Sequence, residues 1–138
     1  MILDTSGLLA ALDSRSAKHD NARRALAEAP APLVLSPFIL AELDYLVTAR
    51  VGPHATRDLL EDVGRGAYEL AAVGPEDLAQ AAAVIDRYHD LRIGLADASI
   101  VVLAARYETS RVLTLDERHF RALRTLEGRP FTLLPADA

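Results

Sequence analysis

Short runs of aliphatic residues alternate along the chain with longer stretches in which apolar residues recur at helical spacing. The runs that predict strands are 1–3, 33–35, 68–72, 111–115 and 131–134. The stretches that predict helices are 6–12, 17–28, 37–50, 53–63, 75–88, 95–107 and 117–123. Strands separated by helices imply parallel connections, with helices covering both faces of one sheet. The pattern therefore predicts a three-layer α/β/α fold around a central, mostly parallel sheet of four to five strands.

Residues at the boundaries of these segments support the assignment. Ser36 suits the cap of the helix that starts at Pro37, because its hydroxyl can accept a free backbone N–H and proline fits a first turn. The Gly64-Arg65-Gly66 break ends the following helix. In folds of this class ligands gather at the carboxyl ends of the strands, so chemistry is expected there.

The 138 residues fit one domain, 1–138, and suffice to bury a real core. The chain has no cysteine, which excludes disulfides, thiolate zinc sites and a cysteine nucleophile. No targeting or membrane segment is expected, since Asp4 interrupts the apolar start. The longest apolar run, 100–105, is far below the ~18 residues that cross a bilayer. These features fit a cytoplasmic protein.

The formal net charge of −5 argues mildly against a nucleic-acid ligand, because phosphate binding usually needs a basic surface. Four acids bound to a metal would leave the rest of the chain close to neutral. Arginines also outnumber acids between Arg106 and Arg129, which could form one basic face. All but one of the 15 basic residues are arginines, which suits bidentate phosphate contacts, although coding bias explains the ratio as well.

Two aspartates stand directly after predicted strands. Asp4 follows the first strand and Asp116 follows the fourth, so both should lie at the carboxyl edge of the sheet. An aspartate just before a helix is also often only an N-cap. Both interpretations stay open for each residue.

Two further acids, Glu42 and Asp97, lie on predicted helices among apolar neighbours. The neighbours at helical spacing are Phe38, Ile39, Tyr45 and Leu46 for the first, and Ile93, Gly94, Ile100 and Val101 for the second. Such surroundings partly desolvate a carboxylate, which is costly unless a cation or hydrogen-bond donors meet it. The alternatives are a buried salt bridge for Glu42 and a helix cap for Asp97, whose carboxylate Ser99 could orient. Asp44, in contrast, has the pattern of an ordinary surface acid.

If these four acids meet in space, their repulsion is large, because two charges ~4 Å apart cost about 4 kcal/mol at an effective dielectric of about 20. A divalent cation is the usual remedy. Ligand sets made only of oxygen favour Mg²⁺ or Mn²⁺ over zinc. A metal site is therefore the condition under which the four could share one pocket.

Four short motifs resemble the PIN domain. They are Asp4-Thr5-Ser6, Ala41-Glu42-Leu43, Leu95-Ala96-Asp97-Ala98 and Thr114-Leu115-Asp116. One such motif alone is weak evidence, but four in this order, at these places in a chain of this length, are specific. The chain from Met1 to about Pro135 is similar to a VapC-type toxin of a type II toxin–antitoxin pair, and the stretch 113–120 adds to the likeness.

The resemblance implies a PIN-like fold with an acidic pocket for Mg²⁺ or Mn²⁺, formed by Asp4, Glu42, Asp97 and Asp116. Asp4 and Asp97 would be direct ligands, while Glu42 and Asp116 would act directly or through water. The hydroxyls of Thr5 or Ser6 commonly support such a pocket.

The implied reaction is hydrolysis of a phosphodiester in structured RNA, either transfer RNA or the sarcin–ricin loop of ribosomal RNA, which blocks translation. Asp116 or Glu42 could accept or orient the proton of the attacking water. Arg118 and His119 follow Asp116 and are candidate phosphate contacts, although an exposed first helical turn is the simpler explanation.

The implied partners are the RNA, a second copy of the chain in a homodimer, and a cognate VapB-type antitoxin. The antitoxin's C-terminal segment would lie in a groove that leads to the acidic pocket. The setting would be the cytoplasm of a bacterium or archaeon. The apolar helices 37–50 and 53–63 are candidates for groove and dimer surfaces, and core packing explains them as well.

Other classes of function fit less well. A non-catalytic PIN-fold module that binds RNA or protein would not need all four carboxylates. A phosphotransfer protein with Asp4 as nucleophile would want a second aspartate nearby, which Thr5-Ser6 does not supply. A nucleotide-binding fold would need a glycine-rich phosphate loop, and the sequence has none.

Overall fold

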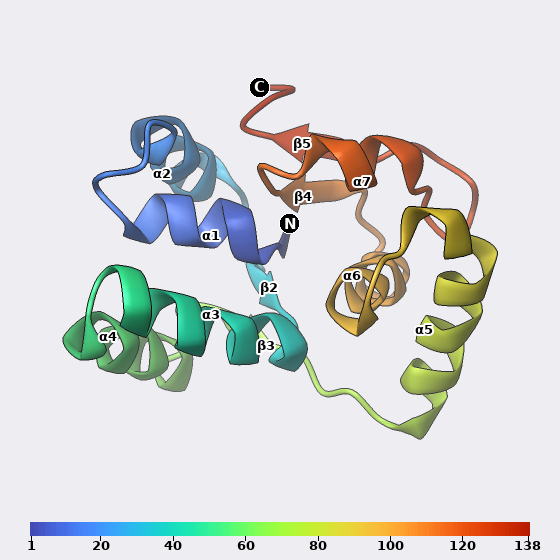
Figure 1. The fold of residues 1–138 in the computed structure, drawn as a ribbon, viewed down its shortest axis with the longest axis horizontal. Coiled ribbons are helices and arrows are strands. Elements are labelled where there is room, and N and C mark those ends of the chain that lie inside the picture. Colours follow the sequence, from blue (N-terminus) through green and yellow to red (C-terminus); the bar gives the residue numbers. More distant parts are fainter.

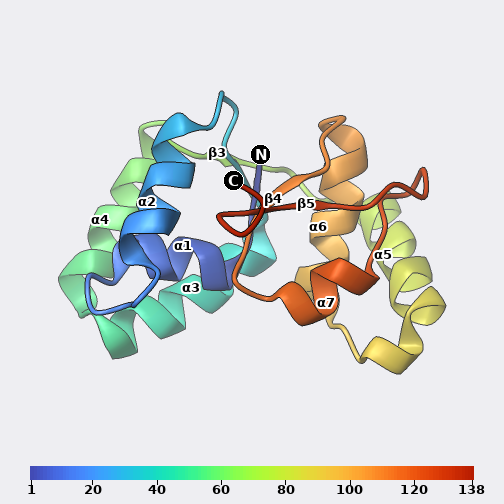
Figure 2. The same ribbon diagram turned by 90° about the horizontal axis from the view of Figure 1, so that it is seen from above.

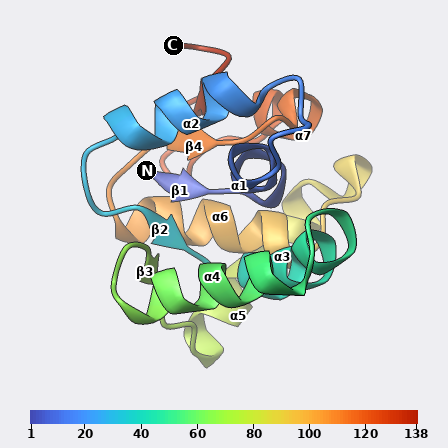
Figure 3. The ribbon, with the colours of Figure 1, turned by 90° about the vertical axis from the view of Figure 1, so that its left-hand side faces the viewer.

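A computed structural model describes all residues of the chain, 1–138. Its sheet has five strands in the order β3-β2-β1-β4-β5. The strands are β1 (Ile2–Leu3), β2 (Val34–Leu35), β3 (Glu69–Leu70), β4 (Arg111–Leu113) and β5 (Thr132–Leu134). Every pair of neighbours is parallel, which confirms the predicted parallel sheet. Figure 3 shows β3, β2, β1 and β4 stacked in this order.

Helices connect the strands and cover both faces of the sheet. They are α1 (Thr5–Leu12), α2 (His19–Glu28), α3 (Pro37–Arg50), α4 (Pro53–Gly64), α5 (Pro75–Arg87), α6 (Leu95–Arg106) and α7 (Glu117–Ala122), with a 3-10 turn η1 (His89–Leu91). Helices α1 to α4 gather on one side of the strands, and α5 to α7 on the other (Figures 1 and 2). The predicted three-layer arrangement is therefore confirmed. None of the helices is both long and apolar enough to cross a membrane.

Most predicted boundaries lie within a residue or two of those in the structure. The Ser36 hydroxyl caps α3 by accepting the Phe38 backbone N–H at 3.3 Å, as predicted. The predicted strand 68–72 shortens to the exposed edge strand β3. The predicted strand 111–115 also ends early, at Leu113. Thr114 still donates its backbone N–H to the Leu134 carbonyl at 2.9 Å, while its side chain contacts Asp4.

The core lies between the central strands and the helices on either side. All four residues of β1 and β2 are completely buried. Helix α6 is buried from Ala98 to Ala104, which explains why its sequence is apolar on every side. This helix packs on β1, and its first turn reaches the carboxyl edge of the sheet. The packing therefore carries Asp97 to the same edge as Asp4.

Helix α1 approaches the end of β4 very closely at Gly7. A Cβ atom on this residue would lie 2.6 Å from the carbonyl carbon of Leu113 and nearer still to its oxygen. Only glycine permits this approach, because backbone atoms of a buried strand cannot move aside. The contact places Thr5 and Ser6, in the first turn of α1, beside the residues that follow β4.

We expect Gly7→Ala to destabilise the protein by about 1–3 kcal/mol, because the added methyl group would overlap the β4 backbone. Urea unfolding measures the loss. Gly64→Ala is the matched control in α4, where an added Cβ meets no atom within 4 Å. That substitution should be neutral or stabilise by up to about 1 kcal/mol. Equal losses for both variants would contradict the close packing of α1.

Candidate active site

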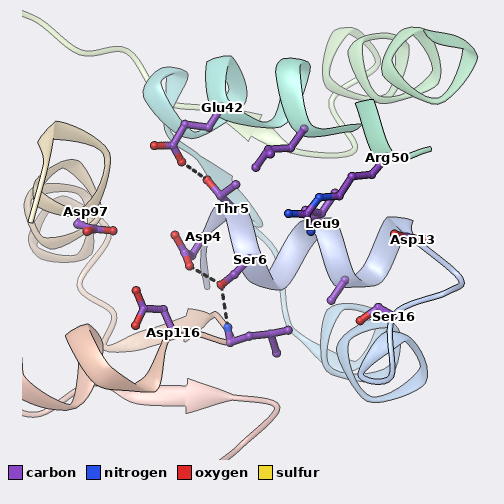
Figure 4. Close-up of a pocket in the computed structure, with 13 residues that line it drawn as sticks. Asp4, Thr5, Ser6, Leu9, Asp13, Ser16, Glu42, Arg50, Asp97 and Asp116 are labelled. Carbon is purple, nitrogen blue, oxygen red and sulfur yellow. Dashed lines mark hydrogen bonds between the residues drawn. The ribbon is translucent and has the colours of Figure 1, made fainter. Parts of the chain in front are cut away.

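A cavity of about 370 Å³ opens at the carboxyl edge of the sheet, beside β1 and β4 (Figure 4). All four predicted carboxylates line it, namely Asp4, Glu42, Asp97 and Asp116. They come from the end of β1, the second turn of α3, the first turn of α6 and the residue before α7. The fold thus brings together four acids that lie far apart in the sequence.

Asp4 is the most deeply placed of the four, with 5% of its surface exposed. It occupies the N-cap position of α1, yet its side chain makes no capping hydrogen bond. Its Oδ2 atom instead accepts hydrogen bonds from the hydroxyls of Ser6, at 2.8 Å, and Thr114, at 2.6 Å. The Asp4 side chain therefore contributes to the cavity and does not cap the helix.

The site carries more negative charge than its surroundings stabilise. Burial raises the pKa of Asp4 above its usual value, and the hydrogen bonds from Thr114 and Ser6 offset only part of this. Burial also raises the pKa of Asp97 to about 6, and the charge of Asp4 adds to the effect. The partial desolvation predicted for Asp97 is therefore confirmed.

Asp116 combines a capping role with a place in the cavity wall. Its Oδ1 atom accepts the His119 backbone N–H at 3.1 Å, so the capping interpretation is confirmed. Its Oδ2 atom lies 2.8 Å from Nδ1 of the His119 ring, and the same Nδ1 lies 4.0 Å from Oδ2 of Asp97. A carboxylate can only accept, so the ring donates its Nδ1–H to Asp116.

Glu42 differs from the prediction, because its side chain is exposed. Helix α3 packs into the core through one stripe of buried residues, Ile39, Leu43 and Val47. Glu42 lies beside this stripe, and its apolar neighbour Tyr45 is itself 74% exposed. The expectation that apolar neighbours desolvate Glu42 is therefore wrong. Its Oε2 atom accepts a hydrogen bond from the Thr5 hydroxyl at 2.5 Å, which directs it to the cavity mouth.

Ser99 does not contact Asp97. Its hydroxyl donates to the Ala96 carbonyl at 2.6 Å and lies 2.8 Å from the hydroxyl of Ser36. The expectation that Ser99 orients the Asp97 carboxylate is therefore wrong. The buried Ser36–Ser99 pair instead joins the start of α3 to the start of α6, the two helices that carry Glu42 and Asp97.

The two candidate phosphate contacts, Arg118 and His119, differ in position. The His119 ring is half-buried between Asp97 and Asp116. Arg118 is exposed and lies outside the lining of the cavity, as an exposed helical turn requires.

Thr114 is a site residue that the sequence analysis did not identify. Its side chain is completely buried. Its hydroxyl donates to Asp4 and accepts the Asp116 backbone N–H at 2.9 Å, so it joins two of the acidic segments. The available signal was a polar residue at the end of a predicted apolar strand, two positions before Asp116.

The donor atoms of the cavity suit a hard divalent cation such as Mg²⁺ or Mn²⁺, because all four acids offer carboxylate oxygens. Burial and neighbouring negative charges raise the pKa values of Asp4 and Asp97, and a bound cation would offset this repulsion. As the side chains lie, no three acidic or histidine residues are arranged to hold one ion. Binding would therefore draw at least one carboxylate further into the cavity.

Known proteins share both the sequence pattern and the fold. The family model of the PIN domain matches residues 1–126. Ribonuclease VapC26 of Mycobacterium tuberculosis is 47% identical over 135 residues, which are 98% of this chain and 100% of that protein.

Two crystal structures have a similar fold. One is Mycobacterium tuberculosis VapC20, a sarcin–ricin loop cleaving toxin, with a TM-score of 0.80 at 22% identity over 94% of this chain and 98% of that chain. The other is VapBC2 from Rickettsia felis bound to a DNA fragment from their promoter, with a TM-score of 0.66 at 15% identity over 96% of each chain.

We expect Asp97→Asn to stabilise the metal-free protein at pH 7 by on the order of 1–2 kcal/mol, allowing for partial exposure of the side chain. The folded-state pKa of about 6 lies above the usual 3.8, so the folded wild-type protein binds more protons between these values. Its stability therefore falls as pH rises from about 4 to about 6. The stabilisation by Asp97→Asn should therefore decrease as pH falls from about 6 to about 4. Thermal unfolding in EDTA at a series of pH values measures both effects.

Asp44→Asn serves as the control for this experiment, since Asp44 is exposed on α3, as predicted, and lies outside the cavity. It should change stability by less than about 0.5 kcal/mol. A gain from Asp97→Asn that does not depend on pH would show that desolvation of this carboxylate is not its cause.

We expect Thr114→Val to raise the pKa of Asp4 further, because it removes a hydroxyl that stabilises the ionised carboxylate. Thr114→Ser keeps the hydroxyl and should leave that pKa close to the wild-type value. Carbon NMR of the Asp4 carboxyl group during a pH titration distinguishes the two variants. Identical titrations of the wild type and Thr114→Val would show that the Thr114 hydroxyl does not influence the pKa of Asp4.

Proposed function

The chain belongs to the PIN domain family, and from this premise we propose that it is a metal-dependent endoribonuclease, the toxin of a type II toxin–antitoxin pair. The observation that carries the proposal is the meeting of four carboxylates in one cavity, namely Asp4, Glu42, Asp97 and Asp116. A relative named as a ribonuclease, 47% identical over nearly the whole chain, supports it.

Asp4 and Asp97 would hold Mg²⁺ or Mn²⁺ directly, with Glu42 and Asp116 binding directly or through water. A divalent ion bound there supplies a water of lowered pKa and a positive charge opposite the phosphodiester. The ionised form of Asp97, which burial disfavours, is the form that such a site requires.

Hydroxyl groups hold two of these carboxylates in place while leaving one oxygen of each open. Ser6 and Thr114 both donate to Oδ2 of Asp4, so its Oδ1 atom is not engaged by either side chain. Thr5 donates to Oε2 of Glu42 and leaves Oε1 open in the same way. The carboxylates of Asp4 and Glu42 are therefore already oriented before a metal ion binds, which lowers the entropic cost of binding.

Glu42 is the better placed acceptor for the proton of the attacking water. Both side-chain oxygens of Asp116 already accept hydrogen bonds from His119. The Oε1 atom of Glu42 accepts none, and the residue is exposed while lining the cavity. A general base must lie within hydrogen-bond reach of the proton that it removes, and Glu42 has a free atom for it.

The proposed substrate is structured RNA, with the sarcin–ricin loop of ribosomal RNA ahead of transfer RNA. The likeness in fold to a toxin that cleaves this loop supports that order. The proposed partners are a VapB-type antitoxin, as in the Rickettsia felis VapBC2 structure, and a second copy of the chain. The proposed location is the cytoplasm, where these RNAs are found.

We expect the purified chain to cleave ribosomal or transfer RNA when Mg²⁺ or Mn²⁺ is present, and to stop when EDTA removes the metal. Asp4→Asn and Asp97→Asn should each reduce the rate by more than about a hundredfold, because each removes a charged ligand. Gel analysis of the RNA measures the rate, and sequencing of the new RNA ends identifies the cleavage site.

Asp44→Asn is again the matched control and should keep full activity. Cleavage that persists in EDTA, or in both active-site variants, would rule out the metal mechanism. Binding of these RNAs without any cleavage under either metal would favour the non-catalytic binding module.

A further inference from the structure

The cavity continues beyond the carboxylates along α1, to the last turn of α3 (Figure 4). At this far end it is lined by Asp13, Ser16 and Arg50. Arg50 is the only basic residue among the 13 that line the cavity. The cavity thus has four carboxylates at one end and its one basic side chain at the other.

The guanidinium of Arg50 makes no hydrogen bond and no ion pair, whereas the neighbouring Arg15 makes several. Arg15 donates to Oδ1 of Asp13 from its backbone N–H, at 3.0 Å, and from its side chain, at 3.1 Å. The pKa of Asp13 is lowered chiefly by these bonds, and to a smaller extent by the charges of Arg15 and Arg50. Asp13 is thus already neutralised by Arg15, and the positive charge of Arg50 remains without a partner.

The backbone that carries Arg50 is nevertheless held in place. The Arg15 side chain also donates to the carbonyl oxygen of Arg50, which lies at the end of α3 where helix carbonyls lack partners. This bond fastens the loop after α1 to the end of α3. The unpaired guanidinium can therefore bind an anion without first breaking an ion pair.

The floor between the two ends is apolar and is formed by Leu9, Ala10 and Leu46. Glu42 and Arg50 lie at the two ends of this floor on the same helix, eight residues apart, which is about 12 Å along α3. An RNA strand has the matching pattern, since its charged phosphates are separated by sugars and bases with extensive apolar surface.

We propose that Arg50 binds a phosphate of the RNA strand other than the one that is cleaved, and so fixes the register in which the strand enters the carboxylate end. The inference rests on the proposed RNA cleavage. The planar guanidinium can hold a phosphate by two parallel hydrogen bonds. This contact forms on substrate binding and persists through the reaction, so it acts on KM and not on kcat.

Arg50→Gln should weaken binding of a fluorescein-labelled single-stranded RNA of randomised sequence by about tenfold, since it removes a charged hydrogen-bond donor. Fluorescence anisotropy in EDTA measures binding while the RNA stays intact. The plot of log affinity against log salt concentration should become less steep by about 0.7, the value for one phosphate contact on a single strand. In cleavage assays, KM should rise about tenfold while kcat stays within about twofold.

The matched control is Arg57→Gln, which removes the same charge from an exposed position on α4 outside the cavity. It should leave the affinity and the salt dependence at their wild-type values. Arg50→Lys should keep the salt dependence but lose part of the affinity, because lysine has the charge without the planar fork. All three variants should unfold at the wild-type temperature.

Equal affinity and equal salt dependence for Arg50→Gln and Arg57→Gln would overturn the inference, as would absence of RNA binding by the wild type. Binding of an oligoglutamate peptide is measured in the same way. If Arg50→Gln weakens binding of this peptide but not of RNA, the inference is also overturned, and Arg50 is assigned to binding of an acidic protein segment. If the wild type binds RNA through Arg50 but cleaves none under either metal, the proposed activity fails while the phosphate site stands. The two failures are therefore distinguishable.

Discussion

The parallel pairing of β1 with β4 is the constraint on which the site depends. It sets Leu3 opposite Leu113, and the backbone N–H of Asp4 donates to the Leu113 carbonyl at 3.0 Å. The first residues after the two strands, Asp4 and Thr114, must therefore be neighbours. The remaining acids are placed relative to this pair. Asp116 follows Thr114 closely, Asp97 lies on α6, which packs on β1, and Glu42 lies on α3, which packs on α1. Gly7 is part of the same constraint, since a larger residue would push α1 away from the end of β4, directly before Thr114.

Bringing these acids together lowers the stability of the fold in the absence of a counter-charge. Burial and mutual repulsion favour the neutral forms of Asp4 and Asp97, whereas metal binding needs the charged forms. The apolar core compensates, because the central strands and most of α6 are buried among aliphatic side chains. Such a division, with stability in the core and strain at the functional edge, is common in enzymes. It also makes ligand binding and folding stability thermodynamically coupled in this protein.

The fold was largely predictable because its signals are local. Ser36 and Pro37 mark the start of α3, and the glycines near residue 64 mark the end of α4, whatever the rest of the chain does.

The site was predictable only as a set of acids. The hydroxyl of Thr114 acts on a residue 110 positions away, and Ser99 pairs with a residue 63 positions away, so neither contact has a local signal. The exposure of Glu42 depends on which stripe of α3 faces the core, and a helix with apolar residues on several sides does not reveal that stripe. Asp4 and Asp116 have the same local pattern before a helix, yet only Asp116 caps.

The size of the cavity has a consequence for how an RNA target is chosen. A volume of about 370 Å³ lies near the lower end of the range for small-molecule pockets, and Asp4 at its base is almost fully enclosed. In a paired helix the partner strand flanks the backbone and hinders its approach to so enclosed a residue. The strand would have to leave its partner locally, in a loop, a bulge or a frayed end. The secondary structure of the RNA would then decide selectivity first. A stable duplex would resist cleavage whatever its base sequence, and cleavage would be confined to positions where the pairing opens locally.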